Sequence, residues 1–172
     1  MPPETSLGPR FTVERPTGSL PSISWRWDPE TDILSGTFRS SGSSRLDGTI
    51  ELTDAEGAIA VLDVADGAVA GLDMVVWPEV TSTRGLSLPS NVETGRVVLR
   101  GPRADRTTSV EIESVLTIRT NPGESLYHLK LGGLPAARAI RVADQLLVEL
   151  DTEDALVGCW LMGVPPFPSL DD

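Results

Sequence analysis

The chain of 172 residues holds few of the side chains on which most enzyme and metal chemistry depends. It has one cysteine, Cys159, and one histidine, His128. An internal disulfide is therefore impossible, and a lone thiol favours a reducing compartment, so we expect a cytoplasmic protein. Zinc sites draw on clustered histidine and cysteine, and carboxylates would have to complete such a site here.

Positive charge is also scarce, because 14 Lys and Arg residues stand against 25 Asp and Glu residues, for a formal net charge of -11. This balance argues against a general role in nucleic-acid binding, since Lys and Arg neutralise the phosphates. No stretch approaches the roughly 18 consecutive apolar residues of a membrane-spanning helix. Residues 1–10 lack the basic-then-apolar order of a signal peptide, in keeping with a cytoplasmic protein.

Catalytic signatures are missing from the sequence. A nucleophilic serine or cysteine needs a base beside it, and His128 is the only imidazole. Because His128 lies in a segment that alternates like a strand, we expect a half-exposed histidine there, and we expect Cys159 to be a buried, inert thiol. The aspartates within 63–73 and 151–154 suit hairpin turns better than a calcium-binding loop. We therefore predict no enzyme activity, no cofactor and no metal site.

The chain does contain period-two alternation of apolar residues, broken by turns. The segments Ile23–Trp27 and Val110–Ile118 each place their apolar residues on one face, which is typical of half-buried strands in an antiparallel sheet. The strongest turn signal is Asp66-Gly67 between two apolar runs, because glycine accepts the positive φ of a type I′ hairpin. The segment 136–144 fits a helix or a strand, with the strand better supported.

The second half of the chain repeats the order of landmarks found in the first half. Turn prolines, Leu-Asp pairs, acidic turn residues, glycines and closing prolines recur with similar spacing. The matched positions are Pro29 and Pro122, Leu62–Asp63 and Leu150–Asp151, Asp66 and Asp154, Gly71 and Gly158, and Pro78 and Pro165. We predict an all-β, mainly antiparallel fold in which two tandem β-meander repeats pack as a sandwich or a pseudo-twofold β domain.

The expected domain boundaries follow from this repeat. Residues 22–78 form the first β repeat and residues 109–164 the second, with an inter-repeat insertion at 79–108 that carries an Arg-rich hairpin. The proline-rich ends, 1–21 and 165–172, have few apolar residues and no period, which predicts extended terminal arms. Arms without a core of their own suit docking along a partner.

The two copies resemble the bacterial domain-of-unknown-function family numbered 2283. The shared pattern is a Pro-x-x-Asp-x-Leu turn, a strand ending in Leu-Asp, an acidic turn, and Leu-Val-Gly before a closing apolar strand. The matching pieces are Pro29–Leu34 with Leu62–Met74, and Pro122–Tyr127 with Leu150–Met162. The resemblance implies a small β-rich fold. It implies no catalytic residue, because the family has no established activity.

Two sets of side chains are candidate partner-binding residues. The insertion concentrates five arginines against two acids, and the guanidinium fork suits carboxylate and phosphate groups. Aromatic residues are enriched in protein–protein contacts, although the joint core of the two repeats is the alternative place for the tryptophans. The candidates are Arg84, Arg96, Arg100, Arg103, Arg106, Trp25, Trp77 and Phe167.

These observations predict a non-catalytic accessory or structural subunit that binds and stabilises a larger protein assembly, either soluble or at the cytoplasmic face of a membrane complex. Its partners would be protein subunits of that complex, with a peripheral contact to an anionic membrane surface as a further option and no nucleic acid. The alternative is a small-molecule-binding or regulatory domain with a pocket between the two repeats, and a seam filled by side chains would count against it.

Overall fold

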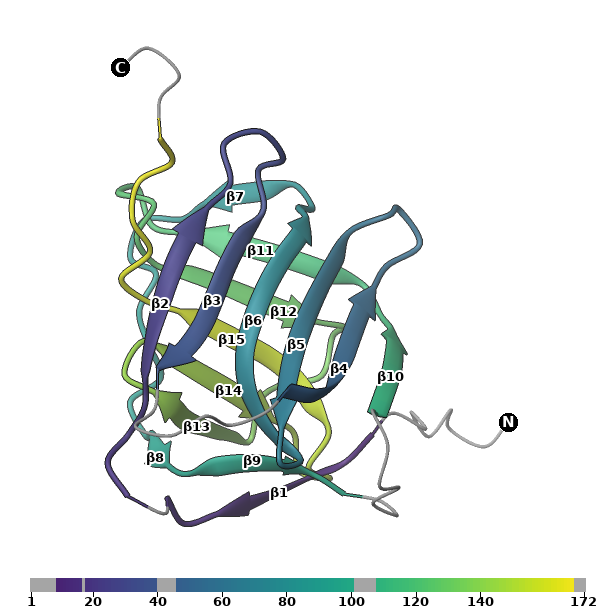
Figure 1. Ribbon diagram of the computed structural model, residues 1–172. Coiled ribbons are helices and arrows are strands. Elements are labelled where there is room, and N and C mark those ends of the chain that lie inside the picture. The colour runs from purple at the N-terminus through teal and green to yellow at the C-terminus, as the bar shows by residue number, and fades with distance from the viewer. Residues whose placement is uncertain (1–8, 17, 40–45, 101–107, 169–172) are drawn as a thin grey trace.

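Two facing β-sheets make up the protein in the computed structural model, which describes residues 9–16, 18–39, 46–100 and 108–168 (Figure 1). Sheet 1 contains β1 (Phe11–Glu14), β2 (Ser22–Trp27), β3 (Leu34–Arg39), β4 (Leu46–Thr53), β5 (Ile59–Ala65), β6 (Ala68–Val76), β9 (Arg96–Leu99) and β10 (Thr108–Glu113). Sheet 2 contains β7 (Val80–Ser82), β8 (Glu93–Thr94), β11 (Leu116–Thr120), β12 (Tyr127–Leu131), β13 (Arg138–Ala143), β14 (Leu146–Leu150) and β15 (Leu156–Leu161). The described residues form no helix that could cross a membrane. The predicted all-β fold is confirmed.

The two sheets share one strand order. Neighbouring strands follow the order β2-β3-β6-β5-β4 in sheet 1 and β11-β12-β15-β14-β13 in sheet 2. When the five strands of each set are numbered along the chain, the second lies beside the fifth (β3 beside β6, β12 beside β15), and the fifth lies beside the fourth (β6 beside β5, β15 beside β14). The predicted duplication requires this arrangement, and a common origin of the two halves stays a prediction. Most strand pairs are antiparallel, and the described parallel pairs join β10 to β4, β11 to β7 and β13 to β8.

Two local predictions agree with the structure. Asp66 and Gly67 connect β5 to β6 with φ values of 52° and 77°, which fits the positive φ that both central residues of a type I′ turn adopt. Residues 138–143 form strand β13, so the strand reading of segment 136–144 is right. Ile140 and Val142 in that strand are buried in the core, as their alternation requires.

The prediction of one continuous strand over Val110–Ile118 is wrong. Strand β10 ends at Glu113 in sheet 1, and β11 begins at Leu116 in sheet 2. The apolar side chains before and after the break belong to the same core cluster, or pack against it, although they come from opposite sheets. The alternation therefore continues in phase while the chain passes from one sheet to the other, and periodicity alone cannot show the crossing.

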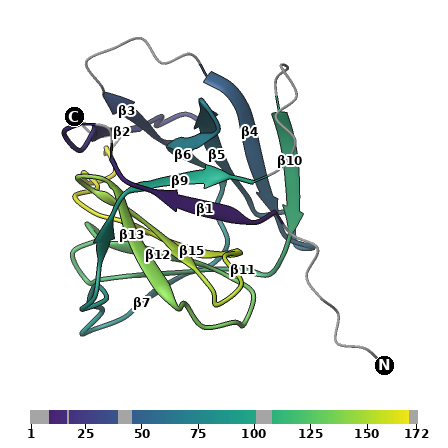
Figure 2. The same ribbon diagram turned by 90° about the horizontal axis from the view of Figure 1, so that it is seen from below.

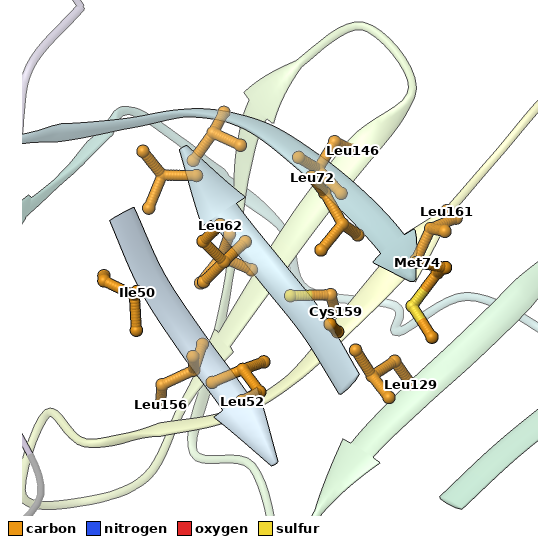
Figure 3. Packing of buried hydrophobic residues seen from close by; sticks show 14 of the residues in the cluster. Ile50, Leu52, Leu62, Leu72, Met74, Leu129, Leu146, Leu156, Cys159 and Leu161 are labelled. Carbon is orange, nitrogen blue, oxygen red and sulfur yellow. The ribbon is translucent and has the colours of Figure 1, made fainter. Parts of the chain in front are cut away.

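The inner faces of the two sheets pack directly on each other (Figure 3). Side chains from both sheets meet there, and the labelled ones are Ile50, Leu52, Leu62, Leu72, Met74, Leu129, Leu146, Leu156, Cys159 and Leu161. Each fully buried aliphatic side chain contributes about 1.5–3 kcal/mol through its removal from water. Cys159 is buried as predicted, and burial raises the pKa of its thiol far above the usual range. The seam between the two sheets is filled by side chains.

The insertion and the N-terminal arm extend the sheets. Strands β7 and β8 join opposite edges of sheet 2, whereas β9 pairs with β1 and touches the start of β6 in sheet 1. Strands β8 and β9 do not pair with each other, so the described part of the insertion does not form the expected hairpin. Residues 11–14 of the predicted arm form β1, which lies beside β9 across one end of the sandwich (Figure 2). Phe11 is fully buried there, so this part of the arm belongs to the core.

We expect Phe11→Ala to destabilise the protein by about 3–5 kcal/mol, because it removes a buried aromatic ring and leaves a cavity. Urea unfolding followed by tryptophan fluorescence measures this loss. Val115→Ala is the control, since the Val115 side chain is 65% exposed and its loss should stay within about 0.5 kcal/mol. Equal stability of the two variants would contradict a structural role for β1.

Candidate functional site

A cleft runs along β2 and β3 on the outer face of sheet 1. Its volume is about 690 Å³. Because Ile23 and Trp25 of β2 face the core, Ser24 and Arg26 point to the outer side, opposite residues of β3. The lining residues are Ser24, Arg26, Trp27, Asp28, Pro29, Ser35, Thr37 and Arg39.

The cleft presents hydroxyl and guanidinium groups together with one carboxylate, that of Asp28. Ser24, Ser35 and Thr37 supply hydroxyls that can donate or accept hydrogen bonds. Arg26 and Arg39 supply two positive charges, and neither forms an ion pair within the part of the chain that the structure describes. Both arginine residues are exposed. The cleft can therefore receive an anionic group without breaking a described ion pair.

Two half-buried carboxylates lie next to the cleft on the same face. Asp73 of β6 is opposite Ser35, and Asp63 of β5 is opposite Gly71. Burial, together with the smaller effect of the nearby charge of Asp73, raises the pKa of Asp63 to about 6. Burial also raises the pKa of Asp73, against hydrogen bonds from the Ser35 side chain and the Gly36 backbone. The outer face of sheet 1 thus has a basic side over β2 and β3 and an acidic side over β5 and β6.

Sheet 2 carries a matching arrangement of a glycine and a carboxylate. Glu149 pairs with Gly158 as Asp63 pairs with Gly71. A Cβ atom added at Gly71 would lie 2.8 Å from Asp63 Oδ2, and one added at Gly158 would lie 2.7 Å from Glu149 Oε1. In both sheets the glycine, Gly71 in β6 or Gly158 in β15, has no side chain, and this leaves room for the carboxylate of the neighbouring strand. The other matched positions are Arg26 and Arg119, Ser35 and His128, and Asp73 and Trp160.

His128 is the centre of the polar cluster on sheet 2. Its Nε2 lies 2.5 Å from Glu149 Oε1, and its ring stacks on Trp160 with centroids 3.9 Å apart. Arg119 Nη2 lies 3.4 Å from Nδ1, and because a guanidinium can only donate, Nδ1 accepts and Nε2–H donates to Glu149. His128 is 7% exposed, so the prediction of a half-exposed histidine is wrong. Periodicity identifies the face of a strand but not what covers that face.

The cover is the segment 83–92, which joins β7 at one edge of sheet 2 to β8 at the other (Figure 1). The N–H of Thr83 donates to Thr120 O at 2.7 Å, and β8 pairs with β13 beside Arg141. The core fills the inner side of the sheet, and the outer-face side chains of His128, Leu147 and Trp160 are buried, so we infer that the segment crosses on the outer side. It crosses one row of paired residues, which runs Arg119, His128, Trp160, Leu147, Arg141.

The burial pattern of this segment supports its role as a cover. Its half-buried residues are Thr83, Leu86, Pro89 and Val92, which recur at every third position. Three residues per turn is the repeat of a polyproline II helix. The segment is not polyproline II throughout, because Arg84 and Gly85 form a turn in which Gly85 has a φ of 77°. Beneath the segment Leu147 is fully buried, although it belongs to the outer face of sheet 2.

An aromatic cluster closes the end of the sandwich beside the cleft. Trp27 stacks on Trp77 with centroids 5.5 Å apart and meets Phe167 edge-on at 5.1 Å. Trp77 also packs against Tyr127 at 5.5 Å. Phe167 of this cluster is 42% exposed, and Val76 and Val80, which flank Trp77 in the chain, are 44% and 39% exposed. The described part of the C-terminal arm belongs to this end, because the indole N–H of Trp27 donates to Pro165 O at 2.8 Å.

Of the predicted partner-binding arginines that the structure describes, Arg96 and Arg100 form ion pairs, and Arg84 lies apart from them on the covering segment. Arg96 pairs with Glu14 at 3.5 Å, and Arg100 pairs with Asp154 at 3.0 Å. Arg84 is exposed on the covering segment, while Arg103 and Arg106 lie outside the described residues. Of the aromatic candidates, Trp25 and Trp77 are half-buried with bonded indole N–H groups, and Phe167 is exposed.

Sequence reasoning missed Arg26 and Arg39 as candidate binding residues. The alternation of Ile23–Trp27 contained the signal for Arg26, since residues between inward-facing side chains must point outward. The proximity of Arg39 depends on the register of β2 with β3, which pairs Ser22 with Arg39. That register is a tertiary fact, and the alternation within one strand does not specify it.

Neither a search for metal-binding groups nor comparison with known proteins assigns a function to this chain. Among the residues that the structure describes, no group of three or more His, Cys, Asp or Glu is placed to hold a metal ion. Comparisons with models of known protein families and with curated proteins find no match to this chain. The resemblance to family 2283 therefore stays a prediction.

We expect Gly158→Ala to lower the free energy of unfolding by about 1–3 kcal/mol, because its Cβ would press on Glu149 Oε1 and on Leu129 O at 2.9 Å. Urea unfolding measures the loss. Gly133→Ala is the matched control, since no atom lies within 4 Å of its added Cβ, and it should change stability by less than about 0.5 kcal/mol. Two equal losses would contradict the close fit of the carboxylate over the strand.

We expect Asp63→Asn to stabilise the protein near neutral pH. The folded-state pKa of about 6 exceeds the usual value of about 3.9, so wild-type stability is fully present below about pH 4 and falls as the pH rises through 6. The amide does not ionise, and after allowance for solvent screening the variant should gain about 1–2 kcal/mol at pH 7.5 and nothing at pH 4. Urea unfolding at both pH values tests this, with the exposed Glu113→Gln as control. A gain that is the same at both pH values would disprove the assigned cause.

Proposed function

We propose that this chain is a non-catalytic accessory subunit that binds another protein through the aromatic end of the sandwich and the cleft beside it. One observation carries the proposal. The half-exposed aromatic cluster of Trp27, Trp77 and Phe167 continues, through Trp27, into a cleft that holds Arg26 and Arg39. Tryptophan and arginine are the residue types most enriched at the energetic centres of protein interfaces.

The surroundings of the cluster support the same use. Val76, Val80 and Phe167 each leave roughly two fifths of their surface in water. Grouped apolar exposure of this kind is uncommon on soluble monomers and marks contact sites. Covering these side chains with a partner would remove apolar surface from water, while the arginines of the cleft could orient the partner.

Catalysis and ligand binding in the seam have less support. His128 is paired with Glu149, stacked on Trp160 and only 7% exposed, which counts against its contact with a substrate. The space between the sheets is occupied by the hydrophobic core, which counts against a pocket between the two repeats. The proposed assembly is either soluble or part of the cytoplasmic face of a membrane complex.

Affinity purification of tagged protein from its native source tests the proposal. Wild-type protein should co-elute with a stoichiometric protein partner. Val76→Asp and Phe167→Asp should each reduce the co-eluting partner by about tenfold, because a buried charge at an interface costs several kcal/mol. Val115→Asp is the matched control, since Val115 is exposed in the β10–β11 turn, at the opposite end of β11 from Thr120. No partner, or equal loss in all three variants, would disprove the proposal.

A further inference from the structure

We propose that the outer face of sheet 1 binds an extended, acidic segment of the partner protein, which lies across β2 and β3 as the chain's own segment 83–92 lies across sheet 2. This inference rests on the proposed function and adds the position, conformation and charge of the bound segment.

The first support is the equivalence of the two outer faces. Both sheets have the same strand order, and both place a carboxylate over a glycine of the neighbouring strand. In the same register, Arg26 occupies the place of Arg119, and Ser35 occupies the place of His128. A segment that crosses the row of Arg119 and His128 in sheet 2 therefore has a counterpart path along the cleft of sheet 1.

The second support is that only one of the two faces is covered. On sheet 2, His128 and Trp160 are 7% and 5% exposed beneath segment 83–92. At the matched positions on sheet 1, Ser35 and Asp73 are half-buried, and the cleft of about 690 Å³ is open, whereas the matched arginines Arg26 and Arg119 are exposed on both faces. The uncovered face is formed by paired strands, so it offers side chains, rather than strand edges, to a bound segment.

Charge identifies the occupant. The cleft contains two guanidinium groups, Arg26 and Arg39, and one carboxylate, Asp28, so its lining carries a net positive charge in a chain whose formal net charge is -11. Arg26 attracts Asp28 electrostatically, but neither arginine has an ion-pair partner within the described part of the chain. Carboxylates on the bound segment would satisfy these guanidinium groups, since the fork geometry of arginine matches a carboxylate.

Charge complementarity also predicts which part of the bound segment is acidic and which part is neutral or basic. The row of paired residues that begins with Arg26 and Ser35 continues beyond β3 through Asp73 of β6 to Glu51 of β4 and Glu111 of β10. Like charges opposite each other are unfavourable, so the segment should be acidic over β2 and β3 and neutral or basic over β5 and β4. Its backbone should be extended, as burial at every third residue indicates for residues 86–92 of the covering segment.

Site-specific photo-crosslinking in the purified complex tests this inference. A benzophenone amino acid replaces Thr37, an exposed cleft residue of β3, and in a second variant replaces Thr117, an exposed residue on the outer face of sheet 2. Mass spectrometry identifies the crosslinked peptide. We expect position 37 to capture a partner peptide rich in Asp and Glu, and position 117 to capture none.

Charge reversal sharpens the test. Arg26→Glu and Arg39→Glu should each lower the crosslink yield at position 37 by about tenfold, with a stronger effect at low salt. Arg84→Glu is the control, because Arg84 is an exposed arginine of segment 83–92 and should leave the yield unchanged.

The outcomes separate this inference from the proposed function. A partner that co-elutes but gives no crosslink at position 37, or a crosslinked peptide without acidic residues, would overturn the inference and leave the proposed function standing. The absence of any partner would overturn both. Flotation with phosphatidylserine vesicles covers the other anionic surface, and binding to them that depends on Arg26 and Arg39 would overturn the peptide assignment in favour of a membrane.

Discussion

The packing of two apolar sheet faces against each other is the interaction on which the rest of this structure depends. Each strand commits alternate residues to the shared core, so the residues between them must point outward. This constraint places Arg26 beside inward-facing Trp25 and Trp27, and it places His128 beside Tyr127 and Leu129. The packing of the inward-facing residues in the core therefore fixes the positions of the polar side chains on the outer faces.

The two outer faces differ because one of them is covered by the chain itself. Under segment 83–92 the buried polar groups are mostly satisfied, since His128 and Glu149 bond each other. The indole N–H of Trp160 is buried with no partner among the described residues, which costs about 1–3 kcal/mol. The open face of sheet 1 keeps small hydroxyls and acids at the matched positions, where water can still reach them.

A rigid sandwich that presents one open face and one aromatic end is well suited to holding a partner in a fixed orientation. The inter-sheet core restricts the motion of β2 and β3, so the arginines of the cleft and Trp27 keep their relative positions. Side chains on strands are placed more accurately than side chains on loops, which lowers the entropy lost on binding. Apolar contact at the aromatic end and ionic contact in the cleft would then act on the same partner.

The sequence by itself determined the all-β class, the turn at Asp66-Gly67, the strand at 138–143 and the burial of Cys159, because period-two alternation and turn chemistry are local properties. Only the tertiary structure decided that residues 110–118 divide between two sheets, that Phe11 enters the core, and that Arg96 and Arg100 of the insertion form ion pairs with Glu14 and Asp154. It also decided which outer face is covered. These features depend on contacts between residues far apart in the chain, and strand register and chain crossings leave no periodic signal within a single segment.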